Sequence, residues 1–87
     1  MKERIVKSYV DKLTINDIKN FGYQNDIILS DNEYNYLLNM IKNNWYIIVF
    51  GNPNNLFNEL KNNVSDNNYK KIMSLYQIYK NKYINYL

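Results

Sequence analysis

A helical repeat of apolar residues across residues 31–50 constrains the fold of this chain more than any other feature. The repeat comprises Tyr34, Leu37, Leu38, Ile41, Trp45, Ile48 and Val49. At 100° per residue these positions occupy roughly a third of a helix circumference. The composition of residues 45–50 is typical of a strand, but the phase and length of the whole stretch favour one helix of about 20 residues. We therefore predict a central helix over residues 31–50.

Helix-start signals precede two of the predicted helices. Thr14 with Asp17 three residues later, and Ser30 with Glu33 at the same spacing, match the capping box, in which side chain and backbone cap each other. The second pair is the clearest start signal in the chain. These pairs predict a short helix over about 15–21 and support the expected start of the central helix.

Glycine and proline residues indicate the remaining helix boundaries. We expect Gly22 to end the short helix in a left-handed conformation and Gly51 to end the central one. Asn52 is expected to cap the next helix, with Pro53 at its first position, where a missing N–H has no cost. A final helix is expected over about 67–87.

Together with an amphipathic first helix, these signals predict an all-α fold. We expect residues 1–87 to form a single domain, a compact bundle of about five helices, of which two are long (about 31–50 and 67–87). Trp45 is expected to be buried against Tyr76 or its neighbours, together with Leu38, Ile41 and Ile48. Replacing a buried Trp45 by Ala would cost about 3–5 kcal/mol.

The composition argues against several classes of function. Cys and His are both absent, which removes thiolate chemistry, disulfides, the commonest general base and the commonest metal ligand. A phosphate loop and a convergent carboxylate pair are not recognisable either. We therefore predict that the chain is not an enzyme and uses no metal or cofactor.

The longest apolar run, residues 45–50, is too short to span a bilayer, and no apolar stretch of signal-peptide length is recognisable. A cytoplasmic location without membrane association is expected by default. Eighteen Asn, ten Tyr and no Ala are typical of a bacterial protein from an AT-rich genome.

The last helix carries more apolar surface than one neighbouring helix usually covers. Its stripe alternates spacings of three and four and comprises Tyr69, Ile72, Tyr76, Tyr79, Tyr83 and Tyr86. The stripe either closes the bundle or faces a partner in part, since Tyr is enriched at protein interfaces. The candidate partner-binding residues on this helix are Tyr79, Tyr83 and Tyr86.

A second apolar row, Tyr36, Met40 and Ile47, lies opposite the main face of the central helix. Either the short helices cover this row, or it forms an exposed binding patch. The two apolar surfaces favour a small, non-enzymatic helical binding module, which contacts another protein or a second copy of itself.

The alternative is a nucleic-acid-binding regulator that uses the basic terminal helices. Its candidate residues are Lys70, Lys71, Lys80 and Lys82 on the last helix and Lys7 on the first. These charges become neighbours if the two terminal helices pack side by side; otherwise they form an ordinary solvated face. The net charge of +3 is compatible with nucleic-acid binding but does not require it.

From residue 13 onward the order of elements resembles the YqfT-like family, short uncharacterised proteins of low-GC Gram-positive bacteria. The residues that carry the resemblance are Leu13-Thr14 with Asp17, Ile28-Leu29-Ser30 with Glu33, Leu60, Ser65, and Leu75-Tyr76. The likeness covers roughly residues 13–83, although this chain lacks the Ala-rich helices of that family. The resemblance implies a helical domain and adds nothing about mechanism.

Overall fold

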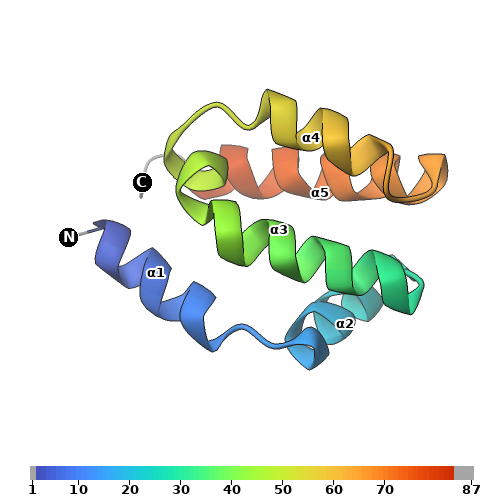
Figure 1. The fold of residues 1–87 in the computed structure, drawn as a ribbon, viewed down its shortest axis with the longest axis horizontal. Coiled ribbons are helices and arrows are strands. Elements are labelled where there is room, and N and C mark those ends of the chain that lie inside the picture. The colour runs from blue at the N-terminus through green and yellow to red at the C-terminus, as the bar shows by residue number, and fades with distance from the viewer. Residues whose placement is uncertain (1, 84–87) are drawn as a thin grey trace.

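Five α-helices and no strand make up the part of the chain that the structure, a computed structural model, describes (residues 2–83; Figure 1). The helices are α1 (Lys2–Lys12), α2 (Ile15–Gln24), α3 (Asp31–Phe50), α4 (Asn54–Lys61) and α5 (Asp66–Tyr83). The all-α prediction and the two long helices are confirmed. In the same part of the chain, no helix is long and apolar enough to cross a membrane.

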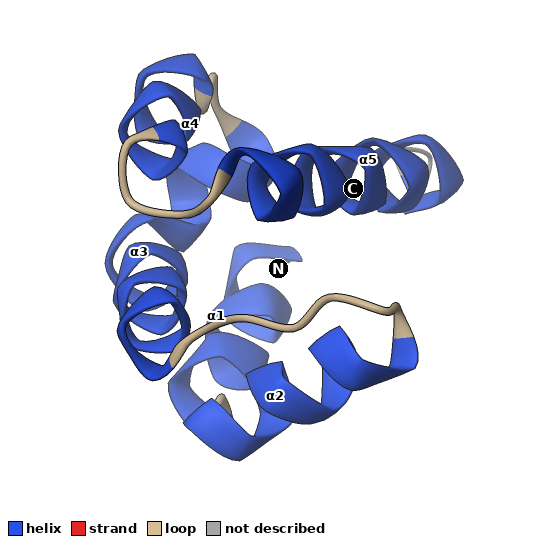
Figure 2. Ribbon diagram, turned by 90° about the vertical axis from the view of Figure 1, so that its right-hand side faces the viewer, coloured by secondary structure: helices blue, strands red, loops and turns tan. Residues whose placement is uncertain are grey.

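Helix α3 is the centre of the arrangement. Helices α1 and α2 pack on it, while α4 packs on α5 (Figure 1). Figure 2 shows α5 and α2 on opposite sides of the molecule, with α3 along one edge. The radius of gyration is 12.6 Å, close to the value of about 12 Å expected for a compact chain of this length. The compact bundle is therefore confirmed, with α2 and α5 facing each other across it.

Helix α2 begins as predicted but ends three residues later than expected. Thr14 and Asp17 form the full capping box, yet the helix continues through Gly22, which is buried and does not have a positive φ. The left-handed position falls on Asp26 (φ 59°). Gly22 is needed for another reason: the Ile27 N–H donates to its carbonyl (2.8 Å), and a Cβ at Gly22 would lie 2.8 Å from the Ile27 oxygen.

Helix α3 has the predicted bounds but contains a kink. Ser30 and Glu33 form the second capping box, and Gly51 is the C-cap. Inside the helix, Asn44 has non-helical backbone angles (φ −132°, ψ 19°), and its side-chain amide donates to the Met40 carbonyl (3.1 Å). Beyond the kink, Ile48 still packs against the core, whereas Trp45 does not.

The kink explains why the expectation for Trp45 is wrong. Trp45 is only half-buried, and its ring contacts the rings of Tyr46 and Phe50, with centroids 5.7 and 6.4 Å away. Tyr76 instead packs edge-on against Phe57 (4.8 Å). Trp45 therefore belongs to an aromatic group at the end of α3 and is not a core residue.

Pro53 differs from the expectation by one position. It precedes α4 as the N-cap residue, and it is buried. The Asn54 N–H donates to the Asn52 side-chain oxygen (3.1 Å), so Asn52 does satisfy a backbone donor at this helix start, as the sequence suggested.

The core consists of two neighbouring clusters. The first joins α2, the 25–30 segment and α3, and its buried residues are Ile18, Ile27, Leu29 and Tyr34. The second joins α3, α4 and the turn before α5, and its buried residues are Met40, Phe57, Leu60 and Val64. Tyr34 (2% exposed) and Leu60 (0%) are the most completely buried large side chains of the described residues.

Leu60 is fully buried and Trp45 is half-buried, and this difference in burial leads to a prediction about stability. Leu60→Ala removes a fully buried side chain and should lower the free energy of unfolding by about 2–5 kcal/mol. Trp45→Ala should cost less, about 1–2 kcal/mol, because the side chain is half-buried and few core contacts are lost. Urea denaturation of both variants would measure this, and a larger loss for Trp45→Ala would contradict the described core.

Candidate binding cleft

An apolar cavity of about 370 Å³ lies between α2, α3 and α5. Its walls include Ile18 of α2, Leu37 and Ile41 of α3, and Leu75 of α5. Among the described residues that line it, only Asp17 carries a charge. We call this cavity the cleft. A space of this size and lining suits apolar side chains or a small apolar ligand.

Two aromatic rings meet across the mouth of the cleft. Phe21 of α2 and Tyr79 of α5 have ring centroids 5.6 Å apart, with planes inclined at 52°. Both rings line the cleft and remain partly exposed, Phe21 at 42% and Tyr79 at 36%. A contact between two exposed rings is worth about 1 kcal/mol. The rings therefore close the cleft weakly.

Glu33 holds the other end of α5 against the start of α3. One of its carboxylate oxygens accepts from the Ser30 N–H (2.9 Å), and the other accepts from the Ser65 N–H (2.8 Å) just before α5. The Asn68 side-chain amide donates to the Ile28 carbonyl (3.1 Å) and lies 3.4 Å from Glu33. We call this group of hydrogen bonds the Glu33 link. It connects two helix N-termini that are far apart in the sequence.

The pKa of Glu33 reflects this link. Partial burial by itself raises the pKa of the carboxyl group, but hydrogen bonds donated by Ser30, Ser65 and Asn68 favour the charged form. Their combined effect exceeds that of burial, so the pKa of Glu33 is lowered. The ionised form of Glu33 is thus the one that holds the link together.

The exposed apolar surface of α5 is confined to its C-terminal half. Tyr69, Ile72 and Tyr76 pack against the second core cluster, so the first part of the predicted stripe closes the bundle. Tyr79 lines the cleft, and its neighbour Ile78 is 61% exposed. Apolar surface is therefore exposed on α5 at these two residues, as the sequence predicted for part of this helix. The side chain of Tyr83 and the whole of Tyr86, also predicted to bind a partner, lie outside the described residues.

The second apolar row of the central helix does not form one surface. Met40 is buried under α4, and Tyr36 is half-buried against the same core cluster. Burial, and in second place the nearby Glu59 carboxylate, raises the pKa of Tyr36. Ile47 is exposed beyond the kink. The interpretation that a short helix covers this row holds for Met40 and Tyr36.

The five lysines of the nucleic-acid alternative do not share one patch. Lys7 pairs with Asp11 (2.8 Å) on α1. Lys71 donates to the Asp26 carbonyl (3.0 Å), while the Lys80 ammonium lies 5.9 Å from the centre of the Tyr76 ring. Lys70 and Lys71 are separated from Lys80 and Lys82 by roughly 14 Å along α5. Nucleic-acid binding stays a prediction that this arrangement does not favour.

Sequence reasoning missed both interactions that define the cleft. The Ser30–Glu33 spacing showed that one oxygen of Glu33 caps α3, but nothing in the sequence indicates that the other oxygen reaches Ser65. The contact of Phe21 with Tyr79 depends on the angle between α2 and α5, which no local sequence pattern indicates. The apolar excess on the last helix was the only sequence signal for this site.

Comparisons with protein-family models, curated proteins and solved structures gave no significant match. The resemblance to the YqfT-like family stays a prediction from the sequence.

The Glu33 link leads to a prediction about pH dependence. A lowered folded-state pKa means that Glu33 stabilises the fold above its unfolded pKa of about 4.3, and that this contribution is lost as pH falls through the folded pKa. Glu33→Gln should lower the free energy of unfolding by about 1–2 kcal/mol at pH 7 and reduce the loss of stability between about pH 5 and pH 3.

Denaturant unfolding across this pH range would measure both effects. Glu59→Gln, a matched change at an exposed position on α4, should alter stability at pH 7 by less than about 0.5 kcal/mol. Equal losses in the two variants would show that the Glu33 link does not stabilise the fold.

Proposed function

We propose that this chain is a small, non-enzymatic binding module whose cleft holds the apolar face of a helix. That helix belongs to another protein or to a second copy of the chain. The observation that carries the proposal is the apolar cavity of about 370 Å³ whose mouth is closed by the Phe21–Tyr79 contact. Amphipathic helices commonly bind in such grooves through side chains at helical spacing.

The shape of the α5 wall supports a helical occupant. Ile72, Leu75 and Tyr79 line the cleft at spacings of three and four residues, so they form a ridge along one helix face. A second helix packs against such a ridge by placing its own apolar side chains in the grooves beside it. The rings of Phe21 and Tyr79 are partly exposed to water. Burying them against an occupant would stabilise the complex.

The chemistry of the lining supports binding over catalysis. The Asp17 carboxylate accepts from the Thr14 N–H (2.9 Å) and so serves the start of α2. The Tyr34 hydroxyl accepts from the Leu29 N–H (3.3 Å). These two polar groups of the described lining accept hydrogen bonds from the backbone and so help to hold the fold together.

A neutral amphipathic peptide tests the proposal. A peptide of about 15 residues with Leu on one face and Gln and Ala elsewhere is long enough to form a helix on binding. We expect it to bind the wild-type chain in calorimetry, and Tyr79→Ala should weaken binding about tenfold or more because the rim ring is lost. Tyr46→Ala, an exposed Tyr on α3 outside the cleft lining, is the control and should change affinity by less than about twofold.

Light scattering over a range of protein concentrations separates the two kinds of partner. Association that rises with concentration and is lost in Tyr79→Ala would identify the second copy as the occupant. A strict monomer would leave another protein as the partner. A monomer that also fails to bind the peptide would contradict the proposed function.

A further inference from the structure

A buried hydroxyl group at the wall of the cleft has a hydrogen atom to donate. Tyr34 lines the cleft and is 2% exposed, and its hydroxyl oxygen accepts from the Leu29 N–H (3.3 Å). A phenol can also donate one hydrogen bond. Among residues 2–83, no group accepts that second hydrogen bond from Tyr34. The hydroxyl therefore keeps an unused donor in a buried position, where a partner is worth most.

The Tyr34 hydroxyl lies where several cleft-lining residues meet. Leu29, in the segment before α3, donates to it, and a Cβ at Gly22 of α2 would lie 3.6 Å from its oxygen. Leu29, Gly22 and Tyr34 all line the cleft. Because glycine has no side chain, position 22 of α2 leaves the hydroxyl uncovered. The donor is thus placed within reach of a molecule inside the cleft.

Water is a poor partner for this donor. A buried water usually makes about three hydrogen bonds to polar groups. The charged residue of the described lining, Asp17, is exposed and serves the start of α2, and most of the other lining side chains are aliphatic or aromatic. Apolar cavities stay dry and bind apolar molecules, as when one of about 150 Å³ holds benzene. An acceptor atom on a mainly apolar molecule is the better partner.

The volume and lining of the cleft limit the size and charge of such a molecule. Scaled from the benzene example, about 370 Å³ holds roughly 10–15 non-hydrogen atoms. A charged group would lose its hydration without gaining a buried counter-charge, since Asp17 is exposed. The molecule is therefore small and neutral.

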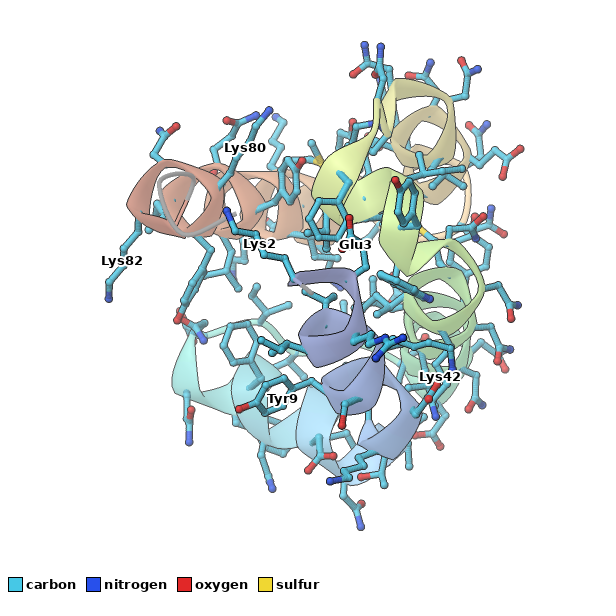
Figure 3. All side chains as sticks on the ribbon, turned by 90° about the vertical axis from the view of Figure 1, so that its left-hand side faces the viewer. Lys2, Glu3, Tyr9, Lys42, Lys80 and Lys82 are labelled. Atoms are coloured by element: carbon cyan, nitrogen blue, oxygen red, sulfur yellow. The ribbon has the colours of Figure 1, made fainter. Side chains whose placement is uncertain are left out.

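Helix α1 adds to the enclosure of the cleft. Figure 3, like Figure 2, shows α1 at one end of the space between α2 and α5, and Leu13, which follows α1, lines the cleft. Small-molecule sites typically bury most of the surface of the ligand and place a few polar groups in an apolar lining. The cleft, with the hydroxyl of Tyr34 in its wall, has this character.

We propose that the cleft binds a small neutral molecule, mainly hydrocarbon, with one carbonyl, ester or ether oxygen that accepts a hydrogen bond from the Tyr34 hydroxyl. This ligand site goes beyond the proposed binding of a helix. Because the ligand and the apolar side chains of a helix would fill the same space, the ligand also excludes the partner helix. That consequence alone rests on the proposed function.

Two bicyclic molecules of nearly equal size test the site. Tetralone has one ketone oxygen, and tetralin is the corresponding hydrocarbon without it. Chemical-shift titration by NMR measures the Kd of each for the wild-type chain and for Tyr34→Phe, which removes the hydroxyl. We expect both molecules to bind the wild type. In Tyr34→Phe the ratio of the tetralone Kd to the tetralin Kd should rise about fivefold or more, because only the ketone loses a hydrogen bond.

The ratio cancels the different hydration of the two molecules and any general effect of the substitution on the cleft. Tyr36→Phe is the matched control, since it removes a hydroxyl from α3 outside the cleft lining. It should leave the ratio within about twofold. Nuclear Overhauser contacts from tetralone to Tyr34 and Ile18 in the wild type are expected and do not depend on how well Tyr34→Phe folds. Contacts confined to residues outside the cleft would overturn the site.

The outcomes separate this ligand site from the proposed function. A ratio that is the same in the wild type and in Tyr34→Phe would overturn the proposal. Failure of both molecules to bind a chain that still binds the neutral amphipathic peptide would overturn the ligand site and leave the binding module standing. Binding of both molecules without binding of the peptide would do the reverse. Where all bind, tetralone should raise the apparent Kd of the peptide, and an unchanged Kd would overturn the shared site.

Discussion

The arrangement of the helices depends on the hydrogen bonds that the Glu33 carboxylate accepts at the starts of α3 and α5. The first turn of a helix leaves N–H groups without partners inside the helix. The two oxygens of Glu33 accept from backbone N–H groups at two such helix starts, at Ser30 and at Ser65. A hydrogen bond to a charged group is stronger than one between neutral groups. The single carboxylate therefore fixes the start of α5 beside the start of α3, although Ser65 follows Glu33 by 32 residues in the sequence.

The cleft follows from holding α5 mainly at one end. The N-terminal half of α5 is fixed by the Glu33 link, by the Lys71 contact with the Asp26 carbonyl and by packing on α4. Farther along α5, the Phe21–Tyr79 ring contact joins the two walls of the cleft. Between these points the apolar faces of α2 and α5 line the cavity of about 370 Å³, although Ile72 and Leu75 of α5 also pack against the first core cluster. Unfilled apolar space costs stability, and an occupant that filled it would stabilise the fold by mass action.

Local signals in the sequence predicted the helices well, because caps and apolar spacing act over a few residues. The Ser30 capping box and the Gly51 C-cap lie where the sequence placed them. Trp45 was misplaced because the kink at Asn44 breaks the helical phase, and an Asn within a helix is an ambiguous signal. For the candidate site, the sequence pointed to Tyr79, because the apolar arc of the last helix is wider than one neighbouring helix can cover. The cleft itself was not predictable, because it depends on the angle between α2 and α5, which no local pattern encodes.

A distance measured across the cleft mouth tests the proposed binding site most directly. The chain has no Cys, so cysteines at Tyr23 and Ile78, which are exposed on α2 and α5, would carry a pair of nitroxide labels without background. A helix about 10 Å wide cannot enter without separating Phe21 from Tyr79. Pulsed electron–electron double resonance should therefore show the label distance lengthening when the neutral amphipathic peptide saturates the protein. An unchanged distance at saturation would place the peptide elsewhere and contradict the cleft as the binding site.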